Sequence, residues 1–92
     1  MAGVMRPIRY GGIAKSDLSV LTKNRIWFCY NNQYLPSDLP TGAGVSSIFI
    51  SFSDYGNDVY TDILFDNAHQ FFFRTHFFGV TSDWMKVNAT RV

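Results

Sequence analysis

The stretch FFFRTHFF, residues 71–78, holds five phenylalanines in eight positions. Successive side chains of an extended strand point to opposite faces, so the phenylalanines fall on both faces of this predicted strand. One face carries Phe71, Phe73, Thr75 and Phe77, and the other carries Phe72, Arg74, His76 and Phe78. One of the two faces packs on the core of the domain, and the second needs a cover because a bare apolar strand face promotes aggregation.

Another copy of the chain is the simplest cover for that second face. A chain of 92 residues buries roughly 60–65% of its unfolded surface, which is too little to hide both aromatic faces. We therefore expect a homo-oligomer, most simply a homotrimer, with Phe72, His76 and Phe78 at the interface between subunits.

Outward from this strand, three other stretches show strand signals. They are residues 26–30 (IWFCY), 46–53 (SSIFISFS) and 59–65 (VYTDILF), separated by turn signals such as DYGND and DNAH. A last strand is expected at the Trp-Met-Lys-Val segment, residues 84–87. Together they predict an all-β fold, a small antiparallel meander or sandwich of about five strands.

The N-terminal part of the chain is expected to contribute little regular structure. Pro7 and the Gly11-Gly12 pair predict an extended arm or connector over residues 1–14, followed by a single domain over residues 15–92. Within KSDLSVLT, Ser16 or Asp17 could cap one short helical turn that directs Leu18 and Leu21 to the core.

Composition narrows the class of partner. The net charge is +1 and the eight Lys and Arg residues are scattered, which argues against a nucleic-acid-binding protein. Charged residues make up 16% of the chain, below the about 25% of an average domain. The sequence has no apolar window long enough for a membrane span and no signal-peptide pattern, and Cys29 lies in an apolar context typical of buried packing.

No motif predicts catalysis, a metal site or a cofactor. His69 and His76 are seven residues apart, which places them on opposite faces of an extended chain. The four aspartates from Asp54 to Asp66 recur every four residues, but they lack the ligand order of a calcium loop. Neither a nucleophile elbow nor a phosphate-binding glycine loop is present, so we expect a protein that is not an enzyme.

Recognition residues are expected in two irregular segments, the long loop at residues 31–44 and the turn at residues 54–58. Loops on a rigid sheet can vary without disturbing the strand ladder. Both segments place tyrosine beside amide or carboxylate groups, the combination that a sugar needs. The candidate ligand-binding residues are Asn32, Tyr34, Asp54, Tyr55 and Asn57. The alternative interpretation is that they are ordinary core and turn residues.

Several segments resemble the knob domain of phage and pyocin tail fibres. They are SDLSVLTKNRIWFCY, LPSDLPTG, SIFISF, VYTDILF and FFFRTHFFGVTSDWMKV, which together cover about residues 16–87. Agreement is best at Asp17-Leu18, Leu21-Thr22, Leu39-Pro40, Phe73-Arg74-Thr75 and the Trp84–Val87 end. The chain departs from the pattern at Ser19, where asparagine is usual, and at Arg25, where glycine is common.

The resemblance implies a small β domain of a virion fibre or spike that contributes to attachment to bacterial surface glycans. On this interpretation the protein is located in the virion, and its partners are other copies, other virion proteins and a glycan. Two alternatives remain open: a capsid or head decoration protein that binds other virion subunits, and a small phage inhibitor of a host protein.

Overall fold

The computed structural model describes residues 7–30, 32–54, 56–88 and 90–92. Its strands are β1 (Arg9–Ile13), β2 (Arg25–Tyr30), β3 (Ser46–Ser53), β4 (Val59–Asp66), β5 (Phe71–Phe77), β6 (Val80–Thr81) and β7 (Met85–Val87). One short 3-10 turn, η1 (Leu18–Val20), precedes β2. In the described part of the chain, no helix has the length and hydropathy needed to cross a membrane.

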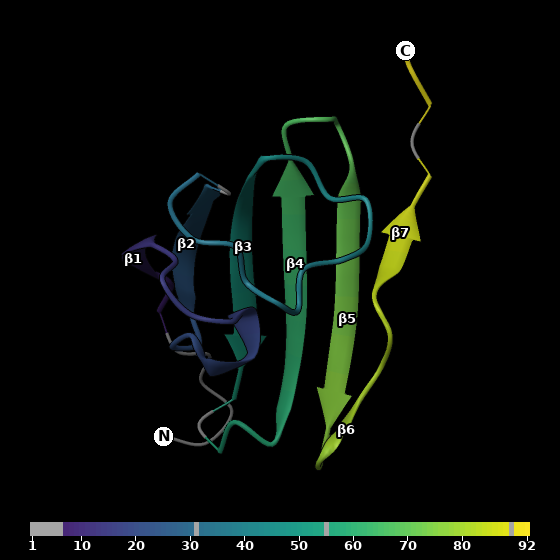
Figure 1. The fold of residues 1–92 in the computed structure, drawn as a ribbon. Coiled ribbons are helices and arrows are strands. Elements are labelled where there is room, and N and C mark those ends of the chain that lie inside the picture. Colours follow the sequence, from purple (N-terminus) through teal and green to yellow (C-terminus); the bar gives the residue numbers. More distant parts are fainter. Residues whose placement is uncertain (1–6, 31, 55, 89) are drawn as a thin grey trace.

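The seven strands form one open sheet in the order β1-β2-β3-β4-β5-β6, with β7 also paired to β5 (Figure 1). Strands β2 to β5 are antiparallel neighbours, whereas β1 runs parallel to β2. The prediction of a β fold is confirmed, and the predicted strands are present. The predictions of about five strands, of a purely antiparallel sheet and of a sandwich are wrong, because the described residues form one mixed sheet of seven strands.

Strand β1 was not predicted from the sequence, because its two glycines indicate a turn. Tyr10 pairs with Ile26 and Gly12 pairs with Trp27, so Gly11 is an extra residue that forms a bulge. A Cβ atom at Gly11 would lie 2.7 Å from two ring carbons of Trp27, too close for any larger residue. Residues 9–13 of the predicted arm belong to the sheet, and residues 1–6 of it lie outside the described residues.

One face of the sheet, which we call the covered face, holds the core. Its centre is a row of side chains from adjacent strands, with Phe49 and Leu64 fully buried and Phe72 nearly so. The segments at residues 14–24 and 32–45 cross in front of this face (Figure 1). Leu18 and Leu21 are buried against it, as predicted.

The two crossing segments are joined by reciprocal hydrogen bonds, in which a carboxylate of each segment accepts from the other. Asp38 accepts hydrogen bonds from the backbone N–H groups of Leu18 (2.7 Å) and Ser19 (2.9 Å). In return, Asp17 accepts bonds from the backbone N–H (2.7 Å) and the hydroxyl (2.8 Å) of Ser37. The predicted cap of the helical turn is wrong in its acceptor: the Asp17 side chain makes no capping bond, and the Asp38 carboxylate accepts from the free N–H groups of η1 instead.

Asp38 also ties both segments to the sheet through Arg74 of β5. The guanidinium donates to Asp38 Oδ2 at 3.2 Å and to Asp62 Oδ2 of β4 at 2.7 Å. Asp62 is fully buried and Arg74 nearly so, so this ionic cluster lies within the core rather than on the surface. Because a buried charge without a partner is costly, each member of the cluster depends on the others.

We expect Asp38→Asn to lower the free energy of unfolding by about 2–3 kcal/mol at neutral pH, because it weakens a helix cap and removes one partner of a buried arginine. Chemical denaturation measures the change. Asp83→Asn, at an exposed carboxylate, is the matched control and should change stability by less than about 0.5 kcal/mol. Equal losses in the two variants would contradict the role of Asp38.

Acid should weaken the contacts of the Asp38 carboxylate, because protonation removes its charge. Burial alone would raise the pKa of the Asp38 carboxyl, but hydrogen bonds from Leu18, Ser19 and Arg74 outweigh it and lower this pKa below its ordinary value. A lowered folded-state pKa gives stability that is complete above the unfolded pKa of about 3.9 and is lost as pH falls through the folded value. Stability should therefore fall below about pH 4, and less steeply in Asp38→Asn.

Cys29 should be inert in the folded protein. Its side chain is buried in the core, and burial raises the pKa of the thiol despite a hydrogen bond from Ser47 that lowers it. Since the thiolate is the reactive form, a thiol reagent should modify Cys29 at least about tenfold more slowly in native buffer than in denaturant. Equal rates would show that the thiol is accessible.

Candidate interaction face

The second face of the sheet, which we call the open face, is formed by the alternate residues of the same strands. Directly paired residues of neighbouring strands lie on the same face of a sheet. The pairing from β2 to β5 therefore places on one face Ile26, Ile50, Ile63 and Phe73. The open face comprises Tyr10, Ile13, Ile26, Phe28, Tyr30, Ser46, Ile48, Ile50, Phe52, Val59, Thr61, Ile63, Phe65, Phe71, Phe73, Thr75, Phe77, Val80, Met85 and Val87.

No strand residue on the open face is charged. All the charged residues of the seven strands point to the covered side, namely Arg9, Arg25, Asp62, Asp66, Arg74 and Lys86. This partition is the reverse of an ordinary surface sheet, whose outer face is polar. The face that carries no charge is the one that the described residues leave uncovered.

The side chains of the open face are half-buried or exposed, and none of them belongs to the core. Two adjacent rows at its centre are wholly apolar: Phe28, Ile48, Phe65, Phe71 and Val87 in one, and Ile26, Ile50, Ile63, Phe73 and Met85 in the other. Threonine, serine and tyrosine occur only outside these two rows, toward the margin. An apolar centre with a polar rim is the usual anatomy of a protein–protein interface.

The margin of the open face ends in an aromatic tip at the β5–β6 turn. Phe77 and Phe78 contact each other edge-to-face with ring centroids 4.7 Å apart, and both rings are largely exposed. Phe78 has φ 45°, followed by Gly79 at 85°. Left-handed backbone is unfavourable for a bulky residue, and such strain is found most often at functional sites.

Two of the three predicted interface residues lie on the covered side, and Phe78 lies at the margin of the open face. Phe72 is 3% exposed in the core, so the interface predicted from the sequence falls on the covered face. His76 is half-buried and stacks on Tyr60 with centroids 4.4 Å apart, also on the covered side. Phe78 lies in the turn beyond β5, where strand alternation no longer applies. Alternation was read correctly, but phenylalanine occurs on both faces and could not show which one the crossing segments cover.

The predicted ligand residues are not brought together. Asn32 and Tyr34 follow β2, whose last residue Tyr30 pairs with the first residue of β3, whereas Asp54 and Asn57 follow the last residue of β3. The length of β3 therefore separates the two groups by about 23 Å at 3.3 Å per residue, too far for one sugar ring. Tyr55 lies outside the described residues.

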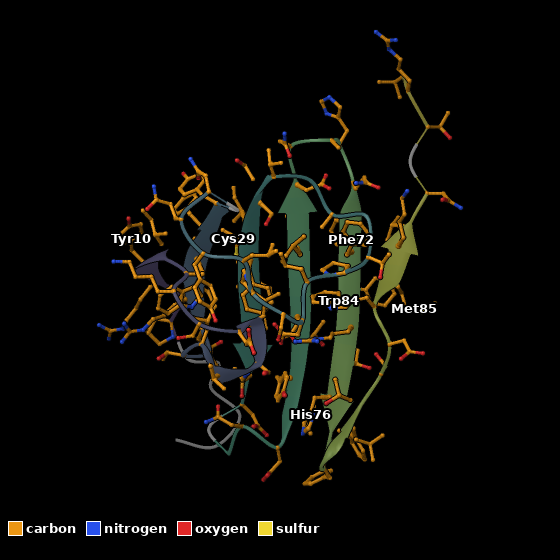
Figure 2. The ribbon with its side chains drawn as sticks, viewed as in Figure 1. Tyr10, Cys29, Phe72, His76, Trp84 and Met85 are labelled. Atoms are coloured by element: carbon orange, nitrogen blue, oxygen red, sulfur yellow. The ribbon has the colours of Figure 1, made fainter. Side chains whose placement is uncertain are left out.

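A shallow hollow beside Trp84 has the chemistry that the loops were expected to supply. It has a volume of about 410 Å³, within the range of small-molecule sites, and is lined by Leu39, Pro40, Thr41, Phe72, Asp83, Trp84 and Lys86. Trp84 lies on the covered side beside β5 (Figure 2), where its ring packs against the core and under Arg74 at 4.5 Å. A flat indole beside carboxylate, ammonium and hydroxyl groups matches sugar-binding chemistry.

Four ionisable groups of the covered side interact with one another, namely Lys23, Asp38, Asp62 and Arg74. Lys23 lies over the Tyr60 ring at 3.9 Å, and burial lowers its pKa although nearby Asp62 raises it. Over the parts of the chain that the structure describes, no three His, Cys, Asp or Glu side chains are grouped as metal ligands would be. The geometry of this side is that of a structural ionic cluster.

Comparisons with known proteins add no relative: no family model, no curated protein and no solved structure matches this chain. The resemblance to tail-fibre knob domains therefore stays a prediction, and the geometry of the two faces is the basis for a functional proposal.

Trp84 should act first as a structural residue. Its indole N–H donates to the backbone carbonyl of Asp38 at 2.8 Å, which fixes the crossing segment to the connection that leads into β7. Trp84→Phe should lower the free energy of unfolding by about 1 kcal/mol through loss of this bond. Trp84→Ala should lower it by about 2–4 kcal/mol because packing is lost as well, although the half-exposed ring limits the cost. Denaturation midpoints that match the parent chain would contradict this role.

Proposed function

We propose that this chain is a structural and adhesion module of a virion, a knob-like domain of a tail fibre or spike, held in a larger protein assembly through its open face. The observation that carries the proposal is the charge-free apolar face of the sheet. A protein that functions alone rarely exposes so large an apolar surface, and such surfaces mark sites of assembly.

The size of the face suits a stable interface. Six strands about 4.8 Å apart and about six residue steps of 3.3 Å give a projected area of about 500 Å², which side-chain relief increases. Stable interfaces bury about 800 Å² on each partner. The open face therefore supplies most of the surface that one subunit of an assembly needs.

The opposite side supplies the surface for attachment. With the open face buried in an assembly, the covered side and its loops remain in contact with solvent, and the hollow beside Trp84 lies there. We place the glycan contact in this hollow, because the two groups of loop residues named from the sequence are too far apart to act together. The support is chemical: one flat ring with Thr41, Asp83 and Lys86 around it.

A capsid decoration protein or a small inhibitor could also use the same open face, so the test must distinguish these three functions.

We expect the labelled chain to adsorb to host bacteria and to their isolated surface glycans. We expect Asp83→Ala combined with Lys86→Ala to weaken adsorption at least about tenfold, or about 1.4 kcal/mol, without a change in the denaturation midpoint. Asp54→Ala, at an exposed carboxylate near the far end of β3, is the matched control for adsorption.

Two other results would overturn the fibre proposal. Co-sedimentation with assembled capsids but no adsorption to cells would favour the decoration protein. A stoichiometric complex of a single chain with one purified host enzyme, together with loss of that enzyme's activity, would favour the inhibitor.

A further inference from the structure

We propose that the occupant of the open face is a second copy of this chain, turned end for end, so that two sheets pack face to face. The inference rests on the proposed function, because it names the partner at the same face. It differs from the sequence-based expectation in both the surface used and the number of subunits: the interface lies on the Phe71 and Phe73 face rather than the Phe72 face.

The absence of charge makes the open face compatible with itself. When identical faces meet, a charged residue near the symmetry axis lies close to its own copy, and like charges at such distances repel. All charged strand residues of this chain are on the covered side, so no such repulsion arises. A partner with a strongly charged surface would find no group of opposite sign on the central rows.

The two central rows are complementary in bulk. The row with Phe28, Phe65 and Phe71 is the larger, and the row with Ile26, Ile50 and Ile63 is mostly aliphatic. A copy turned end for end about an axis across the strands places the larger row of one sheet over the smaller row of the other. Phe65 then faces Ile63 of the second copy, and sheets at the usual separation of about 10 Å can interdigitate.

A three-fold arrangement uses this face less well. Three flat sheets around an axis leave the deepest space at the middle of each sheet, where β3 and β4 meet. Between β3 and β4 the central pairs are Ile48 with Phe65 and Ile50 with Ile63, and the flanking strands carry Phe28, Phe71 and Phe73. The side-chain layer is therefore no thicker at the middle of the sheet than on its flanks, whereas a three-fold core would need it to be thickest there, and void space weakens packing.

The area is sufficient for association. A projected area of about 500 Å² on each copy, increased by side-chain relief, approaches the about 800 Å² per partner of a stable interface. Its apolar centre and polar rim have the anatomy of such an interface.

The test is the mass in solution of the full chain and three variants, measured by light scattering at about 50 µM, a concentration at which micromolar pairs remain associated. The parent chain should have a mass near 21 kDa, twice the 10.5 kDa of one chain. Phe65→Lys and Ile48→Lys should each have the mass of one chain. Both residues are more than a third exposed in the single chain, so lysine is tolerated there without the partner. Far-ultraviolet circular dichroism confirms that each variant is folded.

The matched control is Val20→Lys, which makes the same kind of change at a residue 72% exposed in η1 on the covered side. This variant should keep the mass of the parent chain. A parent mass of one chain, or a pair that survives both open-face substitutions in folded protein, would overturn the inference. A parent mass of three chains would overturn the end-for-end pair and favour the trimer expected from the sequence.

Failure of this inference differs from failure of the proposed function. If the parent is a single chain that co-sediments with purified virion fibres, and Phe65→Lys but not Val20→Lys abolishes that binding, the open face serves a different virion protein. The proposed function would then stand without the pair. If Phe65→Lys changes neither the mass nor the binding, both proposals are wrong.

Discussion

The contact between Asp38 and Arg74 is the constraint on which the rest of the structure depends. A single sheet with seven strands has two faces, and a chain of this size can cover one of them with its own connections. Asp38 helps to determine which face is covered, because its carboxylate caps η1 and also reaches the guanidinium of β5. Asn24 and Gly44 reinforce this choice, because Asn24 bonds to Ser53 of β3 and the N–H of Gly44 donates to Asp66 of β4.

The ionic cluster also explains the distribution of charge over the sheet. Arg74 needs carboxylate partners because it is nearly buried, and Asp62 on the neighbouring strand and Asp38 from the crossing segment supply them. With the charges of β4 and β5 collected on the inside of the domain, the outer side of the same strands is free to be apolar. One arrangement of side chains thus places an ionic cluster inside the domain and leaves an apolar face outside it.

Much of the fold could be predicted from the sequence, since alternation identified β3, β4 and β5 and the aromatic run identified β2. What could not be predicted was the face that the segments at residues 14–24 and 32–45 would cover. Phe72 and Phe73 are chemically alike, and only the partners of Arg74 distinguish their faces. The ligand residues were grouped by composition, but strand register places Tyr34 and Asp54 at opposite ends of β3. Strand β1 was missed because Gly11 and Gly12 indicate a turn when Trp27 is not yet known to lie against them.

The carboxylate exchange between the crossing segments has a consequence for the order of folding. The β3-β4-β5 meander joins neighbours in sequence, so it can form early, whereas the Asp17–Ser37 and Leu18–Asp38 bonds close loops of about 20 residues. Until those loops close, the nascent sheet has two apolar sides in contact with water. A chain in which the meander has formed before those loops close would offer either side to a neighbouring chain. Once Asp38 accepts the hydrogen bonds of η1, the crossing segments cover one side of the sheet, and the open face is left available for association.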